Sequence, residues 1–379
     1  MKRLGPLALA LIFTLNAAVL QVCAQTAETE TEAAEAEQTQ SETALARLEK
    51  WQQIMDKLPH LSGFIQFFYA WEDTRPATSQ FRVRRARITL AGDIYKNYAD
   101  YNFMAEFAGD VKLIDAYLRF TPWKQFNLQA GSFRPAFTLE NTFYGATTTE
   151  FIEYPQIVSR MTTIGDIAGF SNGSAGRDIG IQAFGGFFNQ RGFSTLQYYA
   201  GVFNGHGLSF KGINSHKDIA AMLRVNPTKN LAIAASIYWG KWACAGAGTY
   251  ADRNRWSAGF IYDDSKWFAR GEYIGGETGA LNPANLLVAP APGKNLNSDG
   301  AYLLAGVWFC NRKIAPLFRA DFYSQNTRAR KETTDISYTV GVDCRPWKYL
   351  RCQLNYSLQT HTFRQPNGNQ IAVMVTGMF

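Results

Sequence analysis

Four arginines occupy a short stretch whose other residues alternate as in a β-strand. Residues 81–92 read FRVRRARITLAG and contain Arg82, Arg84, Arg85 and Arg87. A guanidinium group stays charged, and its planar N–H groups match the oxygens of carboxylates and phosphates. At the narrow ring of a pore, such cations replace the hydration that an anion loses. Cationic recognition of anions is therefore the chemistry that this stretch predicts.

Regular strand geometry divides the four arginines between two faces. Because successive side chains point to opposite sides of a sheet, Arg85 and Arg87 share a polar face with Thr89. The same rule puts Arg82 and Arg84 on the apolar face, toward lipid or a neighbouring subunit. Regular alternation therefore predicts two arginines inside and two outside.

Arginines on other predicted strands also fall on polar faces. These wall arginines are Arg119, Arg224, Arg270, Arg319 and Arg351. Acidic residues share the polar faces, namely Asp115, Asp178, Asp218, Glu272, Asp321 and Asp343. Two interpretations stay open: the wall arginines line a path for anions, or they form ion pairs with these acids that stiffen the wall.

The elements that must carry these side chains are short strands. From Leu61 onward the chain consists of runs of roughly ten residues with period-two alternation, separated by polar turns. Short turns are predicted at 95–98, 122–125, 189–192, 227–230, 263–266, 311–313 and 346–349. They alternate with longer segments at 73–80, 109–112, 135–176, 205–216, 243–254, 278–299, 326–333 and 361–369. This alternation requires sixteen strands, with both ends of the domain on the side of the short turns.

A soluble β-sandwich would show the same period as a membrane barrel. Aromatic residues beside the turns, such as Trp123 and Trp347, favour the barrel because an interfacial girdle needs them. The final alternating run, QIAVMVTGMF, ends at Phe379 like the terminal strand of bacterial outer-membrane proteins. The predicted fold class is all-β: a 16-stranded antiparallel transmembrane β-barrel over residues 61–379, with a short N-terminal helix.

Three segments precede the predicted barrel. Residues 1–24 combine two positive charges, an apolar run and small residues near the end, as a secretory signal peptide does, although a lipid-modified Cys23 is an alternative. Residues 25–43 form an acidic spacer without aromatic residues, which we expect to be disordered. Residues 44–59 carry an a/d stripe over two heptads, which predicts a short helix or a small coiled coil between copies of the chain.

Charge is distributed unevenly along the 379 residues. Residues 25–60 carry −5, whereas residues 61–379 carry +10, which favours anionic partners for the barrel. Cys344 and Cys352 flank a predicted turn and can form a disulfide outside the cytoplasm; the alternative is two small, outward-facing residues.

Six local patterns occur along the chain in this order: FRVRRARITLAG at 81–92, DAYLRF at 115–120, GSFRPAFTLENT at 131–142, RDIGIQ at 177–182, YYAGVFNGHG at 198–207 and KDIAAMLRVNP at 217–227. In this order they resemble the phosphate-selective porin O and P family. The resemblance covers about residues 61–230, while the remainder matches mainly in the alternation of apolar and polar residues along its strands. It implies a 16-stranded barrel, usually a trimer, narrowed by an inward-folded third loop and lined by basic groups.

The resemblance also implies a pair of constriction arginines on the second strand, at Arg84 and Arg85. Both can face the lumen only if a β-bulge at Arg84 shifts the register. The long segment 135–176 is the expected constriction loop, and its acids can oppose arginines of the wall. The predicted pore-lining and anion-binding residues are Arg84, Arg85, Arg87, Arg119, Arg134, Arg160, Arg224, Arg270, Arg319 and Arg351.

Other function classes have less support. The four histidines fall on strand flanks or in loops, so no Ser–His pair for hydrolysis is indicated. His206 and His216 share a loop, but two such histidines are more often solvated than bound to a metal. No glycine loop for phosphate, carboxylate pair or nucleic-acid module is apparent. We therefore expect neither an enzyme nor a cofactor, metal or nucleic-acid partner.

The expected function is that of a porin in the bacterial outer membrane, which passes small hydrophilic solutes with a bias towards anions such as phosphate. One alternative is a general or organic-solute porin without phosphate preference. Another is a barrel that acts mainly as an envelope tether or receptor. The expected partners are outer-membrane lipid and lipopolysaccharide, small anionic or polar solutes, and other copies of the chain in a homotrimer.

Overall fold

The computed structural model describes most of the predicted barrel. Its described residues are 47, 58–73, 76–162, 176–190, 192–208, 216–243, 250–278, 295–361 and 367–379. The chain divides into one unit at Met1–Leu58 and a second at Pro59–Phe379. Of the first unit only Arg47, which is helical, and Leu58 are described. The expected signal peptide, acidic spacer and N-terminal helix otherwise lie outside the described residues and stay predictions.

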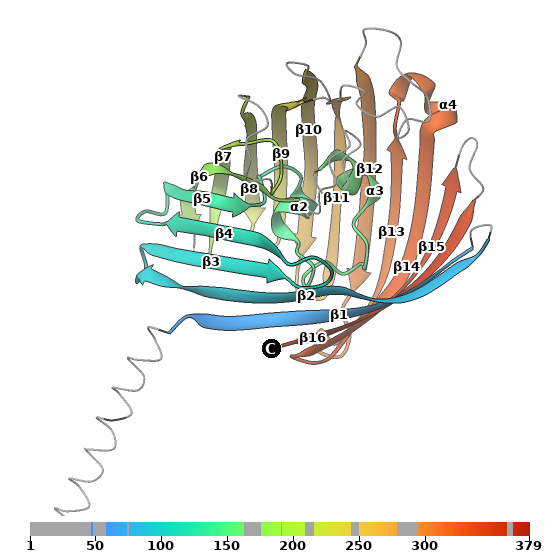
Figure 1. The fold of residues 1–379 in the computed structure, drawn as a ribbon, viewed down its shortest axis with the longest axis horizontal. Helices are drawn as coiled ribbons and strands as arrows, with labels where there is room; N and C mark the ends of the chain where they lie inside the picture. The colour runs from blue at the N-terminus through green and yellow to red at the C-terminus, as the bar shows by residue number, and fades with distance from the viewer. Residues whose placement is uncertain are drawn as a thin grey trace, which may run out of the picture. The chain divides into compact units, whose positions relative to one another are not determined.

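Sixteen strands form one closed antiparallel barrel (Figure 1). Each strand pairs with its neighbours in sequence, and β1 pairs with β16 to close the sheet. The strands are β1 His60–Glu72, β2 Thr78–Tyr95, β3 Ala99–Glu106, β4 Lys112–Phe120, β5 Asn127–Phe133, β6 Asp178–Gln190, β7 Phe193–Phe203, β8 Asp218–Thr228, β9 Leu231–Ala243, β10 Tyr250–Asp263, β11 Trp267–Thr278, β12 Leu296–Val307, β13 Ile314–Ser324, β14 Thr334–Trp347, β15 Leu350–His361 and β16 Gly368–Met378. The predicted fold class and strand number are confirmed, and each predicted short turn lies at a junction between consecutive strands.

The seam between β1 and β16 includes the last residue of the chain. Gly63 N donates a hydrogen bond to Phe379 O at 3.1 Å, and Phe379 N donates to Gly63 O at 3.0 Å. A Cβ at position 63 would stand 2.5 Å from the Phe379 ring and 2.6 Å from the carbonyl oxygen of Arg87. Glycine at this position therefore allows the terminal strand to close the barrel.

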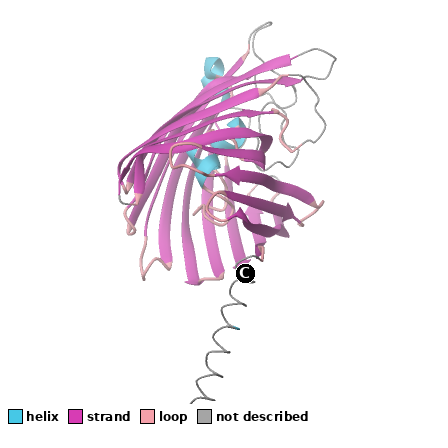
Figure 2. Cartoon of the chain, turned by 90° about the vertical axis from the view of Figure 1, so that its left-hand side faces the viewer, coloured by secondary structure: helices cyan, strands magenta, loops and turns pink. Residues whose placement is uncertain are grey.

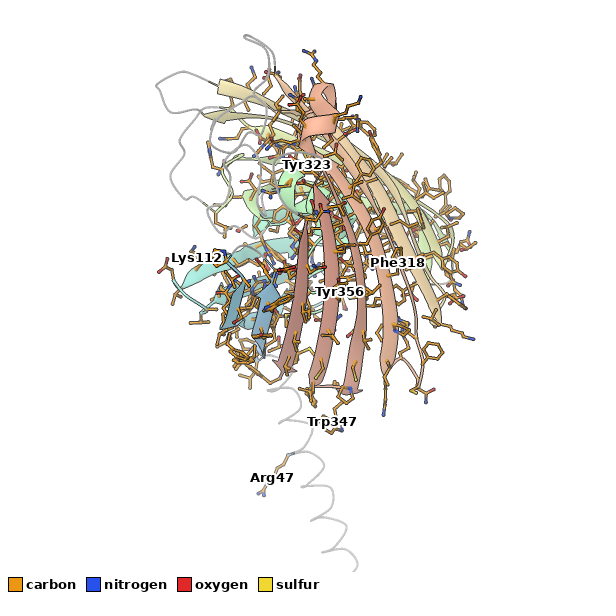
Figure 3. All side chains as sticks on the ribbon, turned by 90° about the vertical axis from the view of Figure 1, so that its right-hand side faces the viewer. Arg47, Lys112, Phe318, Tyr323, Trp347 and Tyr356 are labelled. Carbon is orange, nitrogen blue, oxygen red and sulfur yellow. The ribbon has the colours of Figure 1, made fainter. Side chains whose placement is uncertain are left out.

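The two faces of the barrel wall differ in chemistry. On β15, Tyr356 is exposed, whereas Gln353 and Asn355 are buried. Figure 3 shows Phe318 and Tyr356 along the wall, and Trp347 at the end of the strands. Apolar residues on the outer face and polar residues on the inner face are what a barrel in a lipid bilayer requires. Among the described residues, no helix is long and apolar enough to span a membrane.

Two short helices lie within the barrel, in the segment between β5 and β6 (Figure 2). They are α2 Leu139–Phe143 and α3 Gln156–Met161. The side chain of Thr138 accepts a hydrogen bond from Asn141 N and so caps the start of α2. Residues 134–162 of this segment are named loop 3. Between β13 and β14 lie η2 Thr327–Ala329 and α4 Arg330–Thr333.

Loop 3 and the inner wall share the main hydrophobic core of the described residues. Ile157 and Val158 of α3 are fully buried and belong to one cluster with Ile274, Tyr302 and Leu304 of the wall. Burial of such side chains stabilises the loop by about 1.5–3 kcal/mol for each. Loop 3 is therefore packed against the wall and partly fills the lumen.

Candidate pore constriction

The β1–β2 ladder contains a bulge at Arg84. Gln66 lies opposite Arg85, but the next residue of β1, Phe67, lies opposite Val83. Arg84 is thus left without a partner in this ladder. One extra residue in a strand reverses the alternation of the side chains beyond it.

Because of the bulge, all four arginines of the stretch face the interior. Beyond the bulge, Arg82 lies opposite Phe68, whose side chain is buried in the interior beside loop 3. The guanidinium carbons of Arg82 and Arg84 lie 4.6 and 5.0 Å from the centre of the Phe68 ring. Arg85 and Arg87 keep the inward orientation that alternation predicts. The expectation that Arg82 and Arg84 face lipid or a subunit was wrong, because it assumed a strand without a bulge.

Arg270 fastens loop 3 to β11. Its side chain is 2% exposed, and its Nη2 lies 3.0 Å from Glu140 Oε1 and 2.6 Å from Glu150 Oε2. Both glutamates belong to loop 3. Two carboxylates and one guanidinium are therefore buried together, and removal of the cation leaves both acids unpaired.

Arg319 on β13 and Arg351 on β15 hold the loop by its backbone. Arg319 Nη1 donates to Glu153 O at 2.6 Å. Arg351 donates to the carbonyl oxygens of Thr147 and Thr149, both at 2.6 Å. Each arginine also pairs with an aspartate of the wall. These two predicted residues are thus occupied with loop 3.

The wall also accepts hydrogen bonds from backbone N–H groups of loop 3. The bonds are Leu139 N to Glu272 Oε1 at 2.8 Å, Ile152 N to Asn355 Oδ1 at 2.8 Å, and Gln156 N to Asp321 Oδ1 at 3.2 Å. Buried backbone groups need such partners, since no strand or helix bonds supply them here. Loop 3 is therefore fastened mainly to β11, β13 and β15.

Three adjoining cavities lie along the inner face of the strands from β1 to β7. The loop-end cavity, about 220 Å³, is lined by Arg84, Arg85, Arg87 and Lys112 among others. The central cavity, about 360 Å³, lies between loop 3 and this wall. The turn-end cavity, about 510 Å³, is lined mainly by β6 and β7. Arg87 lines the first two cavities and Tyr199 the last two, so the three form a row from the loop end to the turn end.

The central cavity is basic. Arg87, Arg134 and Arg177 line it together with one carboxylate, Asp115, which gives a net charge of +2. Arg87 Nε donates to Glu106 Oε2 at 2.7 Å. Arg177 donates to Asp115 through two hydrogen bonds, at 2.9 and 3.0 Å. Two of the three arginines that line this cavity are therefore paired with carboxylates.

Three of the predicted arginines on this side lack a carboxylate partner within 4.0 Å among the described residues. Arg85 donates to Gln66 Oε1 at 2.9 Å. Arg134 donates to two backbone carbonyls of loop 3. Arg224 donates to Asn226 Oδ1 at 2.9 Å. Within the described part of the chain, these hydrogen bonds of the three arginines go to neutral acceptors, not to carboxylates.

The last two predicted residues lie apart from these cavities. Arg119 pairs with Asp100 on the neighbouring strand at 3.1 Å and is about two-fifths exposed. Arg160 is exposed on α3. Neither lines any of the three cavities, and a role for them in the pore stays a prediction.

The sequence reasoning did not select Arg177, Phe143 or Tyr199. A signal existed for Arg177, because it opens the stretch RDIGIQ that carries the family resemblance. Tyr199 also lies in such a stretch, YYAGVFNGHG, but neither Tyr199 nor Phe143 could be assigned to the lumen, since an aromatic residue facing a lumen and one facing a core look alike in a sequence.

The pKa values of Glu153 and Tyr144, both in loop 3, are shifted. Burial alone would raise the pKa of Glu153, but the nearby guanidinium groups, above all that of Arg84, lower the pKa below its usual 4.5. Burial raises the pKa of Tyr144 to about 12, and Arg270 opposes this only in part. At neutral pH, Glu153 is therefore ionised and Tyr144 is neutral.

Cys344 and Cys352 lie opposite each other on β14 and β15, and both are free thiols. Within the described part of the chain, no group of three or more His, Cys, Asp or Glu residues is placed to hold a metal ion.

Comparisons with known proteins bear on this geometry. The model of the family described as phosphate-selective porin O and P matches residues 61–217. No curated protein matches the chain significantly. The anion-selective porin from Comamonas acidovorans superposes with a TM-score of 0.64 at 12% identity, over 85% of this chain and 99% of that chain. For OmpF of Salmonella typhi, in complex with daunomycin, the TM-score is 0.62 at 13% identity, over 86% and 98%. For OmpT of Vibrio cholerae, in its trimer form, it is 0.58 at 11% identity, over 85% and 100%.

Because the sequence identities are this low, the structural matches show a shared fold alone, and this fold is that of bacterial porins. The family match includes five of the six sequence stretches on which the resemblance rests and the first residue of the sixth, Lys217. It therefore confirms the resemblance over this part of the chain. The chain has the fold of bacterial porins, a closed sixteen-stranded barrel, and its residues 61–217 match the model of the phosphate-selective porin O and P family.

Proposed function

We propose that this barrel is a passive channel for small hydrophilic solutes with a preference for anions such as phosphate. The observation that carries the proposal is the set of three inward arginines without a carboxylate partner among the described residues: Arg85, Arg134 and Arg224. In the low dielectric of a narrow lumen, a cation without a counter-ion attracts an anion more strongly than one that is already paired.

The proposed path follows the three cavities along the strands from β1 to β7. Arginines on the opposite side of loop 3 contribute less, because Arg270, Arg319 and Arg351 are engaged with loop 3 and with carboxylates. We therefore assign these three to anchoring the loop. The anion path that we propose is lined by Arg84, Arg85, Arg87, Arg134 and Arg177, and Arg224 lies beside it against the ring of Phe143.

Reversal potentials across a planar bilayer with a potassium chloride gradient test this function. The unmodified channel is expected to favour chloride over potassium, and Arg85→Gln to weaken that preference because it removes an unpaired cation. The matched control is Arg312→Gln, in an exposed turn, where the side chain is 47% exposed and pairs with Asp263. Equal permeation of potassium and chloride, together with no effect of phosphate on the chloride current, would refute the anion preference.

A general or organic-solute porin without phosphate preference is the second candidate. The carboxylates of Glu106 and Glu153 favour it, because they neutralise Arg87 and Arg84 beside the path. Phosphate added during the bilayer experiment separates the two candidates. Reduced chloride current at low phosphate concentration supports a phosphate preference, and an unaffected current in an anion-selective channel supports the second candidate.

We further propose a homotrimer in contact with lipopolysaccharide and outer-membrane lipid. OmpT of Vibrio cholerae, which shares the fold, has a trimer form, and this supports the proposed assembly. Mass measurement of the detergent-extracted protein tests it.

A role as an envelope tether remains the alternative for residues 25–60: their deletion is then expected to disturb the envelope while the conductance stays normal.

A further inference from the structure

The central cavity carries aromatic side chains beside its arginines. Tyr117 on β4, Phe143 on loop 3 and Tyr199 on β7 line it, and each is only partly buried. The ring of Tyr199 lies 6.0 Å from that of Phe143 and 6.2 Å from that of Phe184, measured between ring centres. Phe184 in turn lines the turn-end cavity. Phe143, Tyr199 and Phe184 therefore form a continuous row, named the aromatic track, from the central to the turn-end cavity.

Cations stand next to the aromatic track. The guanidinium carbon of Arg224 lies 4.8 Å from the centre of the Phe143 ring. Arg134 lines the same cavity as Phe143 and donates to the backbone of loop 3 beside it. Neither arginine has a carboxylate partner among the described residues. A positively charged group and an apolar ring surface are thus available to one bound solute at the same time.

The ring surfaces discriminate between classes of anion. An inorganic phosphate ion gains nothing from contact with an apolar ring and loses hydration there. An anion with a flat apolar body removes water from its own ring and from the track together, and its ring can stack on the track. Its charged head can meanwhile accept hydrogen bonds from a guanidinium group. The central cavity, at about 360 Å³, also falls within the roughly 300–1,000 Å³ of typical small-molecule sites.

We infer that the central cavity and the aromatic track select organic anions that carry a ring, such as aryl phosphates and aromatic carboxylates, over inorganic phosphate. This inference rests on the proposed function, because it assumes that anions pass through the central cavity. It deepens that function by naming the class of solute.

Block of the chloride current by two phosphate esters tests the inference. Phenyl phosphate and methyl phosphate share the charged head and differ in the ring. The concentration that halves the single-channel chloride current is expected to be at least about fivefold lower for phenyl phosphate, because only this ester buries ring surface on the track. Equal half-blocking concentrations for the two esters would overturn the inference.

Two variants locate the effect on the track. Phe143→Leu and Tyr199→Leu are expected to reduce the ratio of the two half-blocking concentrations to below about twofold, because each removes a ring from the path. Phe318→Leu is the matched control, since Phe318 lies on the outer wall (Figure 3) and is 47% exposed. The variants belong to loop 3 and to β7, so a local folding defect in one leaves the other as a test. An unchanged ratio in the variant that still folds, or an equal loss in the control, contradicts the inference.

The outcomes also separate this inference from the proposed function. If reversal potentials show no preference for anions, the proposed function fails, and the inference fails with it. If the channel prefers anions but both esters block it equally, only the selection of ring-bearing solutes is wrong.

Discussion

Glu153 of loop 3 and Arg84 of β2 form an ion pair inside the barrel. Arg84 Nη2 donates to Glu153 Oε2 at 2.6 Å, and Nη1 donates to the second carboxylate oxygen. The backbone carbonyl of Glu153 accepts a hydrogen bond from Arg319 on β13. One loop residue thus connects two separate parts of the wall, and the bulged position of Arg84 makes this connection possible.

Replacement of Glu153 by Gln is expected to strengthen the preference for anions. The change removes a negative charge beside Arg84 and frees that guanidinium to attract solutes. We expect the chloride-to-potassium permeability ratio to rise by about twofold, as measured from reversal potentials. Glu332→Gln, at an exposed position of α4, is the control and should leave the ratio unchanged. A ratio that stays constant or falls in the Glu153 variant would show that this carboxylate does not face the path.

Acidification is expected to have the same effect as Glu153→Gln. The pKa of Glu153 in the folded chain lies below its usual 4.5, because nearby arginines outweigh the opposite effect of burial. The Arg84–Glu153 pair therefore contributes stability above pH 4.5 that is lost as the pH falls through the lowered pKa. Anion preference should stay constant at higher pH and rise only below this value. Reversal potentials at several pH values check this, and Glu153→Gln should lack that component of the rise; identical pH profiles for the two proteins would disprove it.

Removal of the cation that anchors loop 3 is expected to destabilise the barrel. Arg270→Gln leaves Glu140 and Glu150 buried without their partner. Breaking a buried ion pair from one side costs about 3–5 kcal/mol. Thermal unfolding in detergent should therefore occur at a lower temperature, and single-channel currents should fluctuate more because the loop is held less firmly. Arg312→Gln serves again as the exposed control, and equal unfolding temperatures for both variants would exclude an anchoring role for Arg270.

Mild oxidation is expected to link Cys344 to Cys352. The two residues are direct cross-strand partners, and Cβ atoms in such pairs lie about 4.5–5.5 Å apart, close to the spacing that a disulfide needs. Thiol–disulfide exchange with an excess of a small disulfide should convert the two thiols into one disulfide, while the small disulfide is reduced. Alkylation followed by mass spectrometry should then find only Cys310 labelled among the three described cysteines. Labelling of Cys344 and Cys352 after oxidation would contradict the prediction, and Cys344→Ser is the control that leaves Cys352 without its partner.

The strand count and the turn positions were predictable because their signals are local. A strand between lipid and a polar lumen must alternate apolar and polar residues, as Gln353, Asn355 and Tyr356 do on β15. Each strand from β2 to β15 meets a short turn at one end, such as PWKY at 346–349. These signals repeat along the chain, so an error at one strand does not spread to the count of the others.

The orientation of Arg82 and Arg84 was not predictable from alternation, because one extra residue reverses the faces of a strand. The register of β2 is decided by hydrogen bonds to β1 and by the contact of Arg84 with Glu153, a residue far away in the sequence. The family resemblance pointed to the bulge, but regular geometry did not. The contacts of Arg270 and Arg351 with loop 3 were also not predictable, because they too join residues that are far apart in the sequence.

The sequence by itself determined that this chain forms a sixteen-stranded barrel with a basic interior, since alternation and composition are properties of neighbouring residues. Only the tertiary structure decided which arginines anchor loop 3 and which, such as Arg85 and Arg224, lack a carboxylate partner among the described residues. It also decided that Phe143, Tyr199 and Phe184 form a row. The physical reason is that pairing of charges and contact of rings depend on distances between segments, which are set by the path of loop 3 through the lumen.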